Sequence, residues 1–233
     1  MGVFDWFKKK SVAPKSAANG ENASFIGKLN KLFDEKRYDE IISAVNERYR
    51  DERPPIEVKR ILAPAYYYEK DYEASLKFSQ EVAAELDDIA SWFNVLSALM
   101  ALGRPQEGRE VFDKILEKNK GAKSAGAGAD FIPQLSVPYL RFNYAVMLAE
   151  IDAFEDALSQ VEPLEEIYSK TKITDPTFLY MRGIPPFGDY IELLKKIYNG
   201  LGTNILKSDL INRLRNSVDG EGKKIIEEQI AEE

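Results

Sequence analysis

The feature that most constrains the fold of this chain is a helical hairpin pattern that recurs along it. Five residues mark the predicted start of a second helix: Tyr38, Tyr72, Pro105, Phe154 and Phe187. The intervals between them are 34, 33, 49 and 33 residues. Only the third interval is aberrant, and because it contains a Gly/Ala-rich stretch, we expect an inserted loop over residues 121–135. A period of this length predicts an array of helical hairpins.

Gly108 lies inside the second helix of the third hairpin. An interior glycine costs a helix about 1 kcal/mol relative to alanine, so the site must need the missing side chain. Ser75 and Ala157 occupy the corresponding positions of the second and fourth hairpins, and the larger Ile41 and Tyr190 occupy those of the first and fifth.

A resemblance to a known family rests on the period and on five residues: Trp92, Gly103, Gly108, Phe112 and Ile115. Together they resemble a tetratricopeptide repeat (TPR), over about residues 23–199 in five units, the last of them degenerate. The resemblance implies an all-α fold in which hairpins stack into a right-handed α-α superhelix, or solenoid. It also implies that the second helix of a hairpin crosses the first closely, with a small residue such as Gly108 at the crossing. Because Ile41 and Tyr190 are larger, we expect wider spacing in the first hairpin and irregular packing in the fifth. An irregular α-helical bundle or another α-α repeat class is the alternative.

The chain divides into three predicted parts. Residues 1–22 form a flexible tail, residues 23–200 the repeat array, and residues 201–233 capping helices that cover the end of the array. One helical face of the cap carries six apolar residues: Ile205, Leu206, Leu210, Ile211, Leu214 and Val218. Pro64 and Pro163 lie inside predicted helices and are expected to kink them.

Composition excludes several functional classes. The chain has no cysteine and no histidine, so thiolate chemistry and the commonest general base and transition-metal ligand are missing. We therefore expect no enzyme activity, no metal and no cofactor. With a net charge of −7, the protein is not expected to bind nucleic acid. No apolar run reaches membrane-spanning length and no secretory signal is recognisable, so we predict a cytoplasmic protein.

The resemblance implies that a partner peptide lies against a concave wall formed by the first helices. Eleven residues are predicted to face this groove: Asn30, Phe33, Arg60, Tyr67, Tyr68, Phe93, Ser97, Met100, Tyr139, Phe142 and Val146. Most of them are apolar or aromatic, whereas family members that clamp a chaperone's terminal carboxylate use Lys, Arg and Asn there. We therefore predict a partner protein segment with apolar or aromatic anchors, and an adaptor, scaffold or chaperone role.

Aromatic residues at helical spacing also serve as core, as a contact beneath the cap or as an oligomer contact, and these alternatives stay open. Three consecutive tyrosines, 66–68, cannot all point the same way because successive residues turn by about 100°. We expect Tyr66 to be buried and at least one of Tyr67 and Tyr68 to be exposed.

The amino-terminal tail supports a second functional hypothesis. It combines aromatic and basic residues: Phe4, Trp6, Phe7, Lys8, Lys9 and Lys10. Such an element binds weakly at an anionic membrane surface or in a groove of a partner. The alternative function is therefore a membrane-peripheral assembly factor that docks through its tail, with mainly structural repeats.

Overall fold

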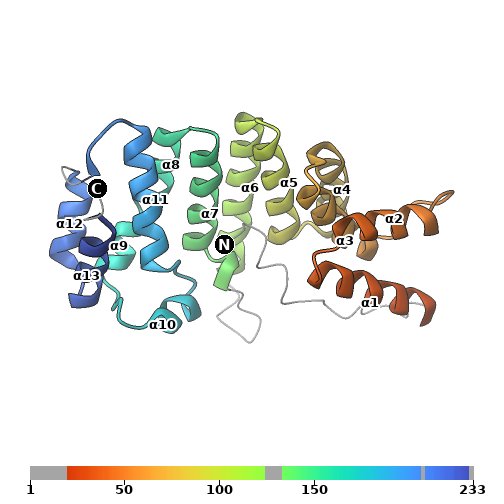
Figure 1. Cartoon of the computed structure of the whole chain (residues 1–233), viewed down its shortest axis with the longest axis horizontal. Helices are drawn as coiled ribbons and strands as arrows, with labels where there is room; N and C mark the ends of the chain where they lie inside the picture. Colours follow the sequence, from red (N-terminus) through yellow and green to blue (C-terminus); the bar gives the residue numbers. More distant parts are fainter. Residues whose placement is uncertain (1–19, 124–132, 206–207, 231–233) are drawn as a thin grey trace. The chain divides into compact units, whose positions relative to one another are not determined.

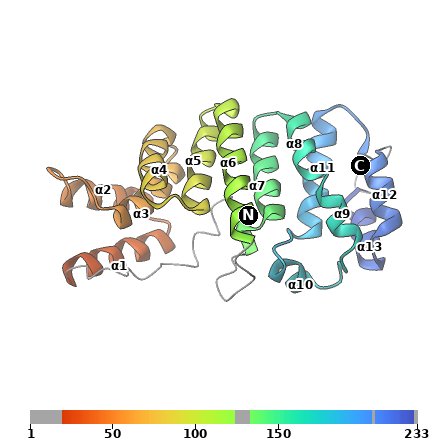
Figure 2. The same cartoon turned by 180° about the vertical axis from the view of Figure 1, so that it is seen from behind.

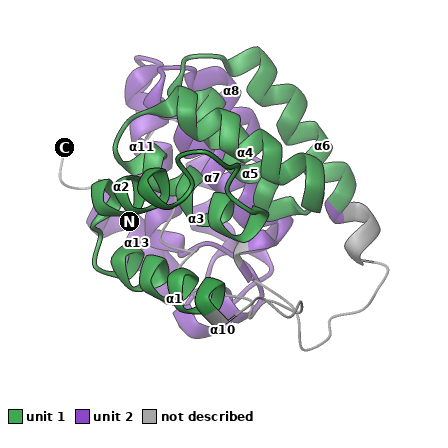
Figure 3. Ribbon diagram, turned by 90° about the vertical axis from the view of Figure 1, so that its right-hand side faces the viewer, with its two compact units in different colours: residues 1–118 green, residues 119–233 purple. Residues whose placement is uncertain are grey.

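The computed structural model describes residues 20–123, 133–205 and 208–230. These residues form helices joined by turns, with no β-strand among them (Figures 1 and 2). The chain divides into two compact units, residues 1–118 and 119–233 (Figure 3), and each unit is described by itself.

The first unit consists of successive helical hairpins. Its helices are α1 (Gly20–Asp34), α2 (Tyr38–Arg48), α3 (Ile56–Tyr68), α4 (Tyr72–Leu86), α5 (Ile89–Ala101) and the larger part of α6 (Pro105–Lys123). Helix α3 packs against α1, α2 and α4, and α5 packs against α3 and α4. The first helix of each hairpin thus contacts both helices of the preceding hairpin, which is the sequential packing expected of an α-α array.

The predicted repeat positions are confirmed as helix starts. Tyr38, Tyr72, Pro105, Phe154 and Phe187 are the first residues of α2, α4, α6, α8 and α11. A left-handed residue precedes four of these starts by two positions: Lys36, Lys70, Gly103 and Asp152. Because the same turn recurs at the same place, hairpin geometry is set locally.

The second unit begins after the inserted segment. Its elements are a 3₁₀ turn η2 (Pro133–Leu135), α7 (Val137–Glu150), α8 (Phe154–Val161), α9 (Leu164–Ser169), α10 (Pro176–Met181), α11 (Phe187–Gly200), α12 (Asp209–Ser217) and α13 (Gly220–Ile230). Helix α7 packs against α8, and α12 packs against α9 and α13. Of the segment predicted as an inserted loop, residues 121–123 continue α6 and Pro133–Leu135 form η2.

Helix α11 corrects the predicted register of the fifth hairpin. We predicted it as a second helix, yet it packs against both α7 and α8, as a first helix does in the first unit. Its other neighbour is α13, so these two form the last pair. The physical reason lies in α10, which Pro176 and the sequence Pro185–Pro186 hold to six residues. A helix that short cannot cover α7 and α8.

The two interior prolines behave differently. Helix α3 continues past Pro64 to Tyr68. At Pro163 the helix breaks instead of kinking, since α8 ends at Val161 and α9 begins at Leu164. After this break the chain enters the segment that contains α9 and α10, which stands where a regular first helix would otherwise lie.

The predicted cap is helical, with a later start. Helix α12 begins at Asp209, so Ile205 precedes it, and Leu206 lies outside the described residues. The apolar residues of the predicted face that can be described are all buried: Ile205, Leu210, Ile211, Leu214 and Val218. The final segment is also a helix, α13, which buries Ile226 and Ile230.

Gly108 allows the close crossing that the sequence predicts. A Cβ atom built at Gly108 would lie 2.7 Å from Met100 Sδ and 3.4 Å from Leu96 Cδ1 of α5. Ser75 and Ala157, at the corresponding positions, are buried as well. The missing side chain therefore makes room for α5.

Replacing Gly108 with valine should lower the free energy of unfolding by about 1–3 kcal/mol, because the added methyl groups overpack the α5–α6 crossing. Gly27 provides a matched control, since it lies in α1 with no atom within 4 Å of a built Cβ. Gly27→Ala should raise the unfolding free energy by up to about 1 kcal/mol through helix propensity alone. Urea denaturation followed by circular dichroism measures both, and equal effects of the two changes would contradict the assigned role of Gly108.

Asp219 fastens the start of α13 to the loop before α10. Its carboxylate accepts hydrogen bonds from the backbone N–H groups of Ile173 (2.8 Å) and Gly222 (2.9 Å). Partial burial alone would raise the pKa of Asp219, but the bonds from Gly222, Ile173 and Thr174 outweigh it and lower the pKa.

Asp219→Ala should lower the free energy of unfolding by about 2 kcal/mol at neutral pH, because it leaves these backbone donors without their acceptor. A lowered folded-state pKa means that the contribution is complete above the unfolded pKa of about 4 and is lost as the pH falls through the folded value. Urea titrations at several pH values test this. Glu221→Gln, an exposed change in the same helix, should cost less than about 0.5 kcal/mol; a pH-independent gap for Asp219→Ala would show that the carboxylate charge has no part in it.

Candidate protein-binding surfaces

The first unit gathers three of the predicted groove residues into one aromatic cluster. Tyr68 stacks on Tyr38 with ring centroids 4.5 Å apart and planes 10° apart. Phe33 lies edge-on to Tyr38 at 5.2 Å and to Tyr68 at 6.0 Å. Tyr67 packs between Tyr68 and Tyr72, at 6.1 and 5.2 Å. The cluster joins α1, α2, α3 and α4.

Exposure within this cluster is graded. Phe33 and Tyr38 are each 9 % exposed, whereas Tyr67 and Tyr68 are half-buried. The inner rings therefore serve as core, and the outer tyrosines present part of each ring to solvent. A partner would meet the edge of a pre-packed aromatic group, whose side chains have already lost most of their rotamer freedom.

The remaining predictions for the first hairpins are partly corrected. Asn30 is half-buried on α1 and Arg60 is exposed on α3. Tyr66 is half-buried instead of fully buried, with its ring stacked on Phe78 at 5.7 Å. The expected contrast between Tyr66 and its two neighbours is therefore absent, since all three tyrosines are half-buried.

Helix α5 does not supply the predicted groove residues. Phe93, Ser97 and Met100 are 0 %, 0 % and 2 % exposed, so their assignment to a groove is wrong for this structure. The Ser97 hydroxyl is turned to its own helix, donating to the Phe93 carbonyl at 2.9 Å. Nearly every residue of α5 after Ser91 is buried, because this helix is apolar around most of its circumference.

The second unit places the other predicted groove residues on one stripe of α7. Tyr139, Phe142 and Val146 are spaced by three and four residues and are all half-buried. The Ser136 side chain caps this helix, accepting from the Tyr139 N–H at 3.3 Å. These three side chains therefore keep partial access to solvent.

Tyr180 of α10 joins the foot of this stripe. Its ring lies edge-on to that of Tyr139, with centroids 6.5 Å apart and planes 84° apart. The Ser136 hydroxyl donates to the Gly183 carbonyl at 2.5 Å, which holds the end of α10 against the start of α7. Gly183 has a φ of +69°, and a side chain there would collide with Ser136, so only glycine suits both requirements.

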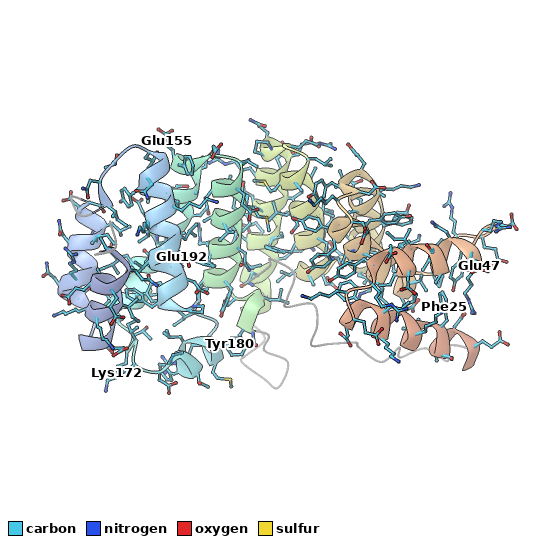
Figure 4. The ribbon with its side chains drawn as sticks, in the orientation of Figure 1. Phe25, Glu47, Glu155, Lys172, Tyr180 and Glu192 are labelled. Carbon is cyan, nitrogen blue, oxygen red and sulfur yellow. The ribbon has the colours of Figure 1, made fainter. Side chains whose placement is uncertain are left out.

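Helix α11 adds two acidic residues that the sequence analysis missed. Asp189 and Glu192 lie one turn apart on α11, which packs against α7. Figure 4 labels Glu192 on α11 and Tyr180 on α10. The sequence does contain a signal that could have identified them. Prolines leave the segment before Phe187 too short for a full first helix, so the helix that begins at Phe187 has to pack in its place.

Electrostatics tie these residues together. Burial, reinforced by Tyr180 and the Asp189 carboxylate, raises the pKa of Tyr139 to about 12, so its phenol is neutral at physiological pH. Partial burial, and then the neighbouring Glu192, raises the pKa of Asp189. Asp189 is nevertheless an exposed side chain, so water still reaches its carboxylate.

A hollow at the end of α2 differs in character from the aromatic surfaces. It is lined by charged residues of both signs: Glu47, Arg48, Arg50, Asp51 and Glu52. The Arg48 guanidinium lies 4.6 Å above the Phe25 ring and donates to Asn22 at 2.9 Å. Because these contacts hold Arg48 in place, we interpret this hollow as part of the packing between α1 and α2.

Three further observations concern metal sites, membrane-spanning helices and the amino-terminal tail. Within the described residues, no group of three or more acidic side chains could hold a metal ion. None of the described helices combines the length and apolar character needed to cross a bilayer. The predicted tail residues Phe4, Trp6, Phe7 and Lys8, Lys9 and Lys10 lie outside the described part of the chain.

Phe93→Ser should lower the free energy of unfolding by about 3–5 kcal/mol, because it removes a fully buried ring. Phe142→Ser should cost less than about 2 kcal/mol, since the half-buried ring loses less apolar contact area. Urea denaturation monitored by circular dichroism measures both values. If Phe142→Ser lowered the free energy of unfolding as much as Phe93→Ser does, Phe142 would belong to the core and not to the half-buried stripe of α7.

Comparison of the chain with protein-family models, curated proteins and solved structures gave no match. The resemblance to the TPR family thus stays a prediction from the residue pattern, and function has to be argued from the surfaces described above.

Proposed function

We propose that this protein is a non-catalytic interaction module of the tetratricopeptide type, which binds a segment of a partner protein as an adaptor, scaffold or chaperone. The observation that carries the proposal is the half-exposed aromatic side chains on first helices, Tyr67 and Tyr68 on α3 and Tyr139 and Phe142 on α7. Aromatic residues in partly desolvated positions dominate the energetics of protein interfaces.

Two further observations support this proposal over a purely structural role for the rings. Tyr67 and Tyr68 lie at the rim of a cluster whose inner members, Phe33 and Tyr38, are nearly buried. Rigid tyrosines offer a large contact area at a low cost in conformational entropy. The lack of histidine and cysteine favours a binding role over catalysis.

The partner expected from this chemistry is a protein segment with apolar or aromatic anchor residues. A helix or an extended chain would place such anchors at regular intervals, matching Tyr139 and Phe142, which lie one helical turn apart on α7. A cytoplasmic location fits this proposal, and no cofactor is required by it.

Capture from native lysate with the full-length protein, followed by mass spectrometry, tests the proposal. We expect one abundant partner, recovered at least about tenfold less well by Tyr67→Ser, because interface tyrosines contribute about 2 kcal/mol or more. Tyr66→Ser is the matched control, since Tyr66 is the adjacent tyrosine, is also half-buried, and packs against Phe78.

Circular dichroism must show equal helicity for the wild type and both variants. Recovery that is unchanged by Tyr67→Ser, or lost equally with Tyr66→Ser, would overturn the role of this surface.

A further inference from the structure

We propose that helix α10 and the loop before it bind the surface of an anionic lipid bilayer. Phe178 and Met181 enter the layer between headgroups and acyl chains, while Lys172 and Arg182 contact the phosphates. These four residues and Tyr180 are here called the α10 tip. None of them carries the proposed function, and a bilayer is a different kind of partner from a protein segment.

The α10 tip exposes apolar side chains that the fold does not cover. Met181 is 63 % exposed and Phe178 is 36 % exposed, and they are two of the three exposed large hydrophobic residues in the described part of the chain. They lie one turn apart on α10, whereas Leu179 is 1 % exposed and packs the helix against its unit. Helix α10 therefore has a second apolar side that faces solvent, which is typical of a contact site.

Helix α10 lies at the lower edge of its unit in Figures 1 and 2, and no described helix packs extensively against it. Contacts near both of its ends nevertheless fix its position. Asp175 caps its start by accepting the Phe178 N–H at 3.1 Å. Beyond its end, the buried Tyr168 hydroxyl donates to the Pro185 carbonyl at 2.8 Å. The exposed side chains are thus carried by a helix that is already held in place.

The charge of this stretch is positive in an otherwise acidic protein. Residues 167–188 contain three Lys or Arg residues and one Asp, although the whole chain has a net charge of −7. Lys170 pairs with Glu166, but neither Lys172 nor Arg182 has an acidic partner among the described residues. Both are exposed, and Figure 4 labels Lys172 at the lower edge of the unit, where α10 lies. This part of the surface therefore attracts a negatively charged partner.

The neighbouring helices leave this positive charge in place. Helix α11, which follows the tip in the chain, carries two acids, Asp189 and Glu192, and two lysines, Lys195 and Lys196. Helix α7, which contacts α10 through Tyr139, carries one Arg and one Glu. Neither helix adds net charge, so the attraction of the tip for anionic lipids is not cancelled.

The side chains of the tip match the layers of a bilayer surface. The Arg182 guanidinium lies 4.2 Å from the centre of the Phe178 ring, so a cation and an apolar ring project from the helix together. A bilayer accommodates both, because long Lys and Arg side chains reach the phosphates while apolar groups enter the layer beneath. Half-buried Tyr180 adds a ring of the type that is enriched at the boundary between membrane and water.

The size of the apolar area favours a bilayer over a protein partner. Phe178 and Met181 together expose about 200 Å², whereas each partner in a stable protein interface buries about 800 Å². A bilayer needs no complementary surface, since lipids rearrange around an apolar tip. The expected binding is therefore weak and depends on the apolar and the basic residues together.

Co-sedimentation of the full-length protein with vesicles tests the inference. Phosphatidylcholine vesicles with about one-third phosphatidylserine should bind the protein at about 1 mM lipid, and pure phosphatidylcholine vesicles should bind it at least about fivefold less. Phe178→Ser/Met181→Ser and Lys172→Gln/Arg182→Gln should each lower the partition coefficient at least about tenfold. Added salt should weaken binding, because it screens the attraction between the two cations and the lipid.

Matched control variants change the same kinds of residue in the first unit. Leu86→Ser removes the third exposed large hydrophobic residue, which is 36 % exposed like Phe178. Lys28→Gln/Arg109→Gln removes one lysine and one arginine from exposed positions. Both controls should bind vesicles within about twofold of the wild type, since charges beyond a Debye length of the lipid contribute little. Circular dichroism must show equal helicity for every variant, and Met181→Ser alone is the milder change if the double variant loses helicity.

A polarity-sensitive fluorophore locates the contact. Because the chain has no cysteine, Met181→Cys offers a single thiol for labelling in the full-length protein. The emission of this label should shift to shorter wavelength on anionic vesicles, since the label enters a less polar layer. The same label on Leu86→Cys should not shift. Binding through the amino-terminal tail alone would leave the label at position 181 in water, so this readout separates the two contacts.

Vesicle binding that is unchanged by both α10 double variants, or an unshifted label at position 181, would overturn the inference. An equal loss with Lys28→Gln/Arg109→Gln would also overturn it, since net charge alone would then explain the effect. If Phe178→Ser/Met181→Ser abolished capture of a protein from lysate and the wild type bound no vesicles, the tip would be a protein contact instead. None of these outcomes involves Tyr67 or Tyr68, so the proposed function is tested separately.

Discussion

The close crossing of the two helices in a hairpin is the interaction on which the rest of this structure depends. Among the described helices of the first unit, each packs mainly against its neighbours in sequence, so no distant helix of that unit compensates for a hairpin that closes badly. Gly108 shows the requirement directly, because its missing side chain is the space that Met100 and Leu96 fill. A recurring left-handed residue sets the turn, and a small residue at the crossing sets the spacing.

The second unit shows what happens when one member of the series is missing. Prolines limit α10 to a single short helix and break α8 from α9, so a full first helix cannot form there. Helix α11 packs against α7 and α8 in its place, and its Asp189 comes to lie near Tyr139 of α7. An irregularity that looks like decay of the repeat thus changes which side chains border the tyrosines of this unit.

Aromatic residues in this protein have two uses that cannot be separated by type. Phe93 and Tyr68 both lie on first helices, yet Phe93 is fully buried while Tyr68 forms the half-exposed side of a stacked pair. The difference follows from the helix that carries each ring. Helix α5 is apolar nearly all round and is buried accordingly, whereas α3 ends in tyrosines whose hydroxyl groups favour the boundary between core and water.

The sequence by itself determined the helical class, the first residues of α2, α4, α6, α8 and α11 and the need for a small residue at Gly108, because these depend on local periodicity and turn chemistry. It also located Tyr67, Tyr68, Tyr139 and Phe142 at positions that keep partial exposure. Only the tertiary structure decided that Phe93 and Met100 are interior and that α11 packs as a first helix. Those outcomes depend on which helices pack together. The lengths of segments such as α10 decide this packing, and hydrophobic periodicity does not encode those lengths.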